Sequence, residues 1–244
     1  MLRKLINKLK KAKNYSEETK TPEWATFHSA STDRALERIV KRGMQIGTVV
    51  DVGASNGSWS EVCLRHFPSS TYLLLEAQAL HSKELNVFCN KHSNSKYVLA
   101  AAGNEDGVCF FDDGDPFGGL ASNEATNGCK TELPMVRIDT LVAKEGLKGP
   151  FLLKLDTHGF ELQIIQGAED LLRQTELAII EAYIFRLNDK ALLAHELCAE
   201  MDKRGFQMID FSEPMWRSKD MALWQLDLFF VKKSNSVFGS NSYS

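Results

Sequence analysis

The feature that most restricts the fold of this chain is an alternation of short apolar runs with segments of helical periodicity. The apolar runs predict strands at 48–53, 72–76, 96–102, 151–156, 177–182, 206–211 and 226–232. The helical patterns cover 57–66, 79–91, 161–173 and 190–204, after a first helix that Ser31 or Thr32 can cap. Such alternation is typical of a parallel sheet with helices on both faces, so we expect an α/β fold. No helical pattern separates the last two apolar runs, which favours an antiparallel final strand.

The chain of 244 residues is long enough for one large α/β domain, which we place at residues 31–233. The segment at about 104–135 is rich in Gly, Asp and Asn, and it interrupts the rhythm as a hairpin insertion or a mobile loop would. Residues 1–30 are interpreted as a basic arm and linker, and the polar residues 234–244 predict a disordered tail.

The charge of the chain is unevenly distributed. The first 13 residues include six basic side chains and no acidic ones, whereas the rest of the chain has an excess of nine acidic side chains. This acidic body is a poor match for nucleic acid. Apolar residues of the basic arm fall at helical spacing, so the arm could form an amphipathic helix on an anionic membrane or a partner. The alternative is a frayed and solvated terminus.

Cysteine usage and hydropathy favour the cytoplasm. The five cysteines are scattered and never form C-x-x-C, which predicts a reducing compartment without disulfides or a zinc site. No apolar run approaches the ~18 residues of a membrane span, and the basic N-terminal residues lack the apolar centre of a signal peptide. We therefore expect a cytoplasmic protein whose one route to a membrane is peripheral contact through the arm.

The stretch VVDVGASNGSWSE at 49–61 joins the first strand to a helix through a glycine-bearing turn. A dinucleotide-binding turn would read G-x-G-x-x-G, but Gly53 and Gly57 lie four residues apart. Asp51 adds a negative charge just before the turn, which would repel a pyrophosphate and attract an ammonium group. Glu76 closes the second strand, where a carboxylate can accept hydrogen bonds from both hydroxyls of a ribose.

These residues together predict S-adenosylmethionine, a cationic nucleoside without phosphate. Taken singly, each also has a structural explanation: an acid that caps a turn, glycines that allow positive φ, and a solvated strand end. The residues expected at the cofactor are Asp51, Gly53, Ala54, Ser55, Asn56, Gly57, Glu76, Ala101, Asn104 and Asp156.

The stretch VVDVGASNGSWS resembles the first motif of class I methyltransferases, and the FkbM family in particular. The blocks LLLEAQ, YVLAAAGNEDGVCFF, MVRIDTL, FLLKLDTHGFELQIIQGAEDLL and LAIIEAYIF follow in the family's order, over about residues 46–232. The family usually reads K-[IL]-D-x-E-G-x-E-x-x-[IVL]-x-G-A in the fourth of these blocks. The residues in register are Lys154, Asp156, Gly159, Glu161, Gly167 and Ala168. His158 stands where the family usually has Glu, which puts the role of that acid in doubt.

The resemblance implies a Rossmann-like class I fold with a seven-stranded, mostly parallel sheet. The implied strand order is 3-2-1-4-5-7-6, with the last-entering strand antiparallel. It also implies transfer of a methyl group to oxygen, on a sugar, glycolipid or natural-product hydroxyl of a small-molecule or glycan acceptor.

Polar residues at the carboxyl ends of the later strands are the candidates for proton removal, because ligands of open parallel sheets bind there. The expected catalytic residues are Asp156, His158 and Glu181. The sequence does not decide whether Asp156 or His158 accepts the proton, and both also suit a turn before the 161–173 helix. Together with Glu161 these side chains could bind Mg²⁺, but one His among carboxylates does not select a cation, and we predict no metal.

Acceptor selection is expected from irregular segments at 14–30, 104–135 and 212–224. Two other functions stay open. A module that binds S-adenosylmethionine or S-adenosylhomocysteine without turnover would account for His158, and an NAD-dependent oxidoreductase is opposed by the missing dinucleotide motif. The oligomeric state is also open.

Overall fold

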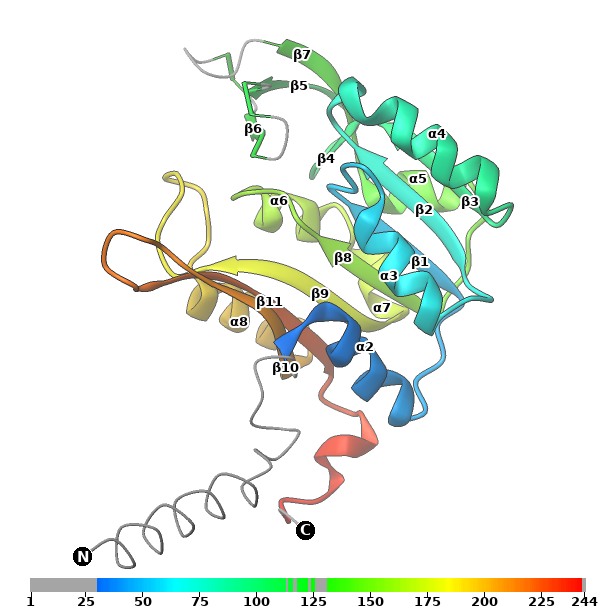
Figure 1. Cartoon of the computed structure of the whole chain (residues 1–244), viewed down its shortest axis with the longest axis vertical. Coiled ribbons are helices and arrows are strands. Elements are labelled where there is room, and N and C mark those ends of the chain that lie inside the picture. The colour runs from blue at the N-terminus through cyan, green and yellow to red at the C-terminus, as the bar shows by residue number, and fades with distance from the viewer. Residues whose placement is uncertain (1–29, 113, 116–117, 123, 126–130, 243–244) are drawn as a thin grey trace, which may run out of the picture.

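The computed structural model describes residues 30–112, 114–115, 118–122, 124–125 and 131–242 (Figure 1). The basic arm, and with it the expected membrane contact, lies outside the described residues. The helices are α2 (Thr32–Lys41), α3 (Ser58–His66), η3 (Ala79–His81), α4 (Ser82–Lys91), α5 (Ile138–Lys144), α6 (Glu161–Gln166), α7 (Glu169–Arg173), α8 (Ala194–Lys203) and η4 (Ser236–Gly239). The strands are β1 (Thr48–Val52), β2 (Thr71–Glu76), β3 (Ser95–Leu99), β4 (Ala101–Ala102), β5 (Gly107–Asp112), β6 (Leu120–Ser122), β7 (Thr131–Val136), β8 (Phe151–Leu155), β9 (Thr175–Tyr183), β10 (Phe206–Trp216) and β11 (Leu223–Lys232).

The main sheet has seven strands in the order β10-β11-β9-β8-β1-β2-β3. With these strands counted along the chain, the order from the β3 edge is 3-2-1-4-5-7-6. β11 pairs antiparallel with β9 and β10, and the other neighbours pair in parallel. The sheet is therefore mixed, with its last-entering strand reversed as the sequence suggested.

A second sheet has the order β4-β7-β5-β6 and forms from the segment that interrupts the rhythm. The prediction of a single strand at 96–102 was wrong, because the chain leaves the main sheet after Leu99 and β4 belongs to the second sheet. Ala101 and Ala102 pair instead with Met135 and Val136 of β7. β5 pairs antiparallel with β6 and with β7. The insertion therefore contains a hairpin, as one of the two predictions for it proposed, and its strands are not part of a mobile loop.

Helices cover both faces of the main sheet, as expected for strands whose side chains are buried throughout (Figure 1). One core cluster joins α2, α3 and α4 to the sheet, and the other joins α5, α6, α7 and α8 to the opposite face. α5 was not predicted, since its seven residues are too few for a clear helical period. The helix predicted at 161–173 is broken into α6 and α7 at Gly167, where a Cβ would lie 1.9 Å from the Gly103 carbonyl oxygen.

The C-terminal residues are more ordered than predicted. The disordered tail was placed at 234–244, but residues 234–242 are described and include η4. Phe238 packs against the cluster on the α2 face, and this apolar contact accounts for the difference. None of the described helices combines the length and the apolar character needed to cross a membrane.

Candidate functional site

The turn after β1 requires glycine at position 53. The N–H groups of Gly53 and Ala54 both donate to the Leu75 carbonyl oxygen, at 3.0 and 2.9 Å. Gly53 has φ +76°, and a Cβ on it would lie 1.9 Å from the carbonyl oxygen of Asp156. The turn can therefore reach the end of β8 only with glycine at this position. Gly57, with φ +81°, begins α3.

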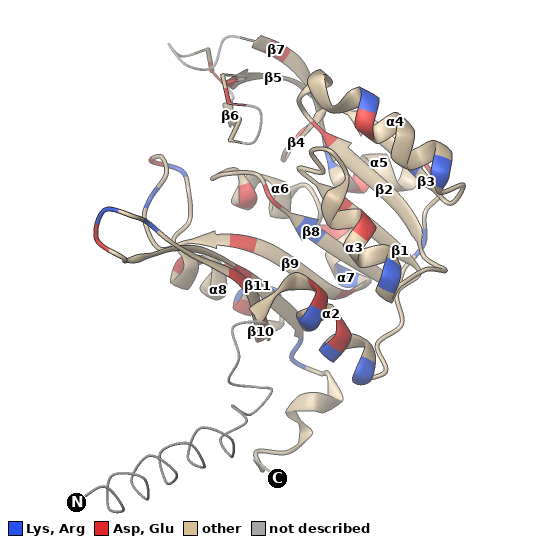
Figure 2. Cartoon of the chain, in the orientation of Figure 1, with Lys and Arg blue, Asp and Glu red and all other residues tan. Residues whose placement is uncertain are grey.

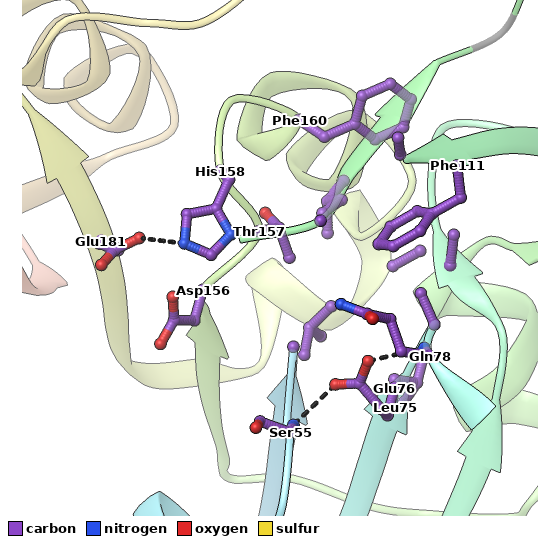
Figure 3. Close-up of a pocket in the computed structure, with 18 of the residues that line it drawn as sticks. Ser55, Leu75, Glu76, Gln78, Phe111, Asp156, Thr157, His158, Phe160 and Glu181 are labelled. Atoms are coloured by element: carbon purple, nitrogen blue, oxygen red, sulfur yellow. Dashed lines mark hydrogen bonds and ion pairs between the residues drawn. The ribbon is translucent and has the colours of Figure 1, made fainter. Parts of the chain in front are cut away.

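A cavity of about 360 Å³ lies at the carboxyl ends of β1, β2 and β8 (Figure 3). Its lining includes Gly53, Ser55, Asn56, Ser58, Glu76, Gln78, Ala101, Ala102, Phe111, Gly119, Ala121, Asp156, Thr157, His158, Phe160, Ile164, Glu181 and Gln225. The second sheet forms one wall, through Phe111 and Ala121. Among the residues that the structure describes, no Lys or Arg lines this cavity, whereas three carboxylates and one His do.

The structure brings six of the ten predicted cofactor residues to the cavity: Gly53, Ser55, Asn56, Glu76, Ala101 and Asp156. Ala54 is buried in the core on the α2 face, and Gly57 is the N-cap of α3, with Phe88 3.4 Å from the place of its Cβ. Asn104 is exposed and outside the cavity, because the chain turns into the second sheet before it.

Asp51, predicted at the cofactor, is not among the described residues that line the cavity. Its side chain is 0 % exposed, and its Oδ2 accepts a hydrogen bond from Ser60 Oγ at 2.7 Å. Side chains alternate between the faces of a strand, and Asp51 lies on the face covered by α3 rather than at the strand end. Its Oδ1 has no hydrogen-bond partner among the described residues, and burial raises the pKa of Asp51.

Glu76 is the carboxylate that the structure fixes at the end of β2. The N–H of Ser55 donates to Oε2 and the N–H of Gln78 donates to Oε1, both at 2.7 Å. Each carboxylate oxygen keeps a further lone pair, so Glu76 can still accept hydrogen bonds from a ligand. Figure 3 shows Glu76 at the side of the cavity opposite His158.

The three predicted catalytic side chains do come together. Asp156, His158 and Glu181 point toward one another in Figure 3, and a ligating atom of each lies within 4.8 Å of the others. His158 Nε2 is 3.6 Å from Glu181 Oε2. Glu181 also accepts hydrogen bonds from the Tyr183 hydroxyl and the Gln225 amide. His158 has φ +52°, so its backbone in this turn is in the left-handed region.

Burial and charge separate the proton affinities of these three groups. Burial would raise the pKa of Asp156, but the Lys154 ammonium, 2.6 Å from Oδ2, outweighs it and holds that pKa below its usual range. Burial, and then the neighbouring Asp156 carboxylate, raise the pKa of Glu181 to about 9. Burial lowers the pKa of His158 against the attraction of Asp156, so the imidazole is neutral at neutral pH.

Two observations bear on a metal ion. The carboxylate of Glu161 does not belong to the group of Asp156, His158 and Glu181, since its Oε1 accepts hydrogen bonds from the Gly159 N–H at 2.7 Å and the Thr157 hydroxyl at 3.3 Å. It therefore stabilises the turn before α6, which is the structural explanation for this acid. The Lys154 ammonium already occupies one oxygen of Asp156, and its positive charge opposes a second cation there.

Several cavity residues were missed from the sequence. No sequence pattern marks three of them. Gln78 and Thr157 lie one or two positions from predicted residues, and Gln225 lies on β11, which pairs with the strand of Glu181. Phe111 was missed because the segment around it was interpreted as an acceptor-selecting insertion. Of the other segments expected to select the acceptor, 14–29 lies outside the described residues. In the segment 212–224, the Trp224 ring stacks on Phe185 with ring centroids 5.4 Å apart.

The chain matches the sequence profile of the methyltransferase FkbM domain over residues 51–208. No curated protein sequence matches it. Among solved structures, it is similar to the methyltransferase FkbM from Methylobacillus flagellatus KT, with 15% identity and a TM-score of 0.49 over 75% of this chain. The aligned region covers only 43% of the length of that protein.

It is also similar to the 1,6-didemethyltoxoflavin-N1-methyltransferase of Burkholderia thailandensis, solved with 1,6-didemethyltoxoflavin and S-adenosylhomocysteine. That match has 12% identity and a TM-score of 0.47, over 94% of this chain and 89% of the other. Structural likeness of this degree says nothing about the ligand or reaction of this chain. The profile match, which covers well over half of the residues, does establish the family: the chain belongs to the FkbM methyltransferases.

Proposed function

We propose that this methyltransferase uses S-adenosylmethionine to methylate a hydroxyl group of a sugar, glycolipid or natural-product acceptor. The observation that carries the proposal is the charge of the cavity. The carboxylates of Glu76 and Asp156 line it beside the Glu181 carboxyl, whose pKa is raised to about 9, and no described Lys or Arg does. A cavity of this charge suits a ligand with an ammonium and a sulfonium group, and it is unfavourable for the diphosphate of a dinucleotide.

The residues present fit the separate parts of S-adenosylmethionine. Glu76 would accept hydrogen bonds from the ribose hydroxyls, since both of its oxygens are already oriented by backbone N–H groups. Phe111, Ala101 and Phe160 give an apolar wall suited to the adenine ring. The start of α3 at Ser58 lies at the cavity and offers a positive helix end to the ligand's carboxylate.

When bound, S-adenosylmethionine supplies the methyl group as an electrophile. The chain must orient the acceptor hydroxyl, exclude water and accept one proton. Of the two open candidates, His158 is the stronger base, because Lys154 keeps the pKa of Asp156 low. Glu181, 3.6 Å from Nε2, orients the imidazole, and Figure 3 shows the other side of the ring facing the cavity.

A labelling experiment tests the reaction and needs no identified acceptor. Purified protein is incubated with S-adenosylmethionine labelled in the methyl group and with fractionated cell extracts, and labelled products are analysed for base-stable methyl ethers. The proposal predicts labelled ethers with the wild type and about 100-fold slower labelling with His158→Gln, the scale of lost general-base catalysis. Label in amines or carbon-bound methyl groups alone would contradict transfer to oxygen.

A further inference from the structure

A buried ionic cluster lies behind the cavity and is formed by Lys154, Asp51, Asp156 and Asp227. Lys154 is at its centre and is only 1 % exposed, although it carries a charge. Its ammonium donates to Asp156 Oδ2 at 2.6 Å and lies 5.5 Å from the centroid of the Trp59 ring. In the parallel register of β1 and β8, Asp51 is the neighbour of Lys154. A buried ammonium is stable only with such anionic partners, so the carboxylates around Lys154 determine where its ammonium lies.

Asp227 is the member of the cluster that no sequence pattern marked. It lies on β11 directly opposite Glu181 of β9, and residues opposite each other in an antiparallel pair project from the same face. Asp227 is 8 % exposed and does not line the cavity. Its Oδ2 accepts a hydrogen bond from Ser212 Oγ of β10 at 3.4 Å. Figure 2 shows an acidic band on β9 and a basic band on β8 within the sheet.

The charges in this region are unequal in number. Within the described part of the chain, the carboxylates of Asp51, Asp156 and Asp227 share the buried ammonium of Lys154. Of these three carboxylates, Asp156 is the one that lines the cavity. An ammonium held by Asp156 alone would cancel most of the negative charge that Asp156 presents to a ligand. The charges of Asp51, on the neighbouring strand, and of Asp227, two strands away, offset that cancellation.

The proton affinity of Asp227 agrees with this arrangement. Burial raises the pKa of Asp227 to about 6; Lys154 opposes the rise, and Asp156 of β8 and Glu213 of β10 add to it. Asp227 is therefore ionised at pH 8, and it is one of the three carboxylates, after Asp156 and Asp51, that keep Lys154 protonated. The acid does not stabilise the fold in this state, because its raised pKa means that ionisation is easier in the unfolded chain.

We propose that Asp227 is a positioning residue whose charge offsets Lys154, so that Asp156 keeps its negative charge toward the cavity and the cavity prefers a cationic ligand. The inference rests on the proposed function, since it concerns the sulfonium of S-adenosylmethionine. S-adenosylmethionine and S-adenosylhomocysteine differ by one methyl group and one positive charge, so the ratio of their dissociation constants reports the local potential.

The experiment is calorimetric titration of both ligands at pH 8 into the wild type, Asp227→Asn and the control Asp210→Asn. Asp210 is an acid of β10 that pairs with Arg38 away from the cavity. For Asp227→Asn, we expect the preference for S-adenosylmethionine over S-adenosylhomocysteine to fall about three- to tenfold, the effect of one charge at this range. Asp210→Asn should leave the ratio unchanged.

Equal weakening of both ligands in Asp227→Asn would show a structural role and overturn the inference, as would an unchanged ratio. If Asp227→Asn does not fold by circular dichroism, Asp227→Ser supplies a smaller neutral side chain for the same comparison. Failure of the proposed function is distinguishable, because the wild type would then bind neither ligand.

Discussion

The backbone N–H of Ser55 donates to Glu76 Oε2 across 2.7 Å, and this bond ties the glycine turn after β1 to the end of β2. The turn and the carboxylate therefore form one preorganised edge of the cavity before any ligand binds. Glu76 is therefore a buried, oriented carboxylate rather than a solvated strand end.

Replacing Glu76 by Gln should weaken S-adenosylhomocysteine binding about 10- to 100-fold, because hydrogen bonds to a charged acceptor contribute about 1.5–3 kcal/mol. Calorimetric titration measures the change. The matched control is Glu84→Gln, an exposed acid of α4 outside the cavity, which should bind as the wild type does. Unchanged affinity in Glu76→Gln would remove this residue from the site.

Gly53 and Gly43 give a paired test of the turn. Both have positive φ, +76° and +78°, but a Cβ on Gly53 meets the Asp156 carbonyl oxygen at 1.9 Å, whereas Gly43 has nothing within 4 Å. Gly43→Ala should cost about 1 kcal/mol of unfolding free energy, and Gly53→Ala should cost more than about 3 kcal/mol or prevent folding. Urea unfolding measures both, and equal costs would contradict the close approach of the two loops.

Glu181 should make stability depend on pH. Its folded pKa of about 9 lies above its ordinary value of 4.5. Its contribution to stability is thus complete below pH 4.5 and is lost as the pH rises through about 9. Glu181→Gln keeps the shape without the ionisation, so at pH 8 it should be more stable than the wild type, by about 1–3 kcal/mol. If Glu181→Gln melted at a lower temperature than the wild type at pH 8, the ionised form of Glu181 would instead stabilise the folded protein.

The rate of methyl transfer should fall on the acid side of a pH profile. Burial lowers the pKa of His158, so the acid limb of kcat/KM should lie at a lower pH than that of an ordinary histidine. His158→Gln should lose this limb together with most of the rate. A profile in which the variant keeps the same acid limb would assign proton removal to Asp156.

The sheet was predictable because each buried strand is a short apolar run with a polar end. The runs at 151–156 and 177–182 correspond closely to β8 and β9, since side chains buried on both faces leave little room for ambiguity. The second sheet was less predictable. β4 continues the apolar pattern of β3, and only its pairing with β7 shows that the chain has changed sheets.

Glu76 ends β2 and Asp156 directly follows β8, so the ends of the apolar runs were enough to predict that both lie at the carboxyl edge of the sheet. For Asp51, the sequence gives its distance from the turn but not the face of β1 on which it lies. Asp227 was missed since its significance depends on Lys154, which lies 73 positions earlier in the chain and two strands away. Contacts of that kind depend on strand order and register.

The most direct measurement is calorimetric titration of the wild-type protein, at one pH and salt concentration, with S-adenosylmethionine and then with NAD. The charge of the cavity predicts a single S-adenosylmethionine site and no measurable heat from NAD. Tight binding of NAD with no response to S-adenosylmethionine would contradict the account.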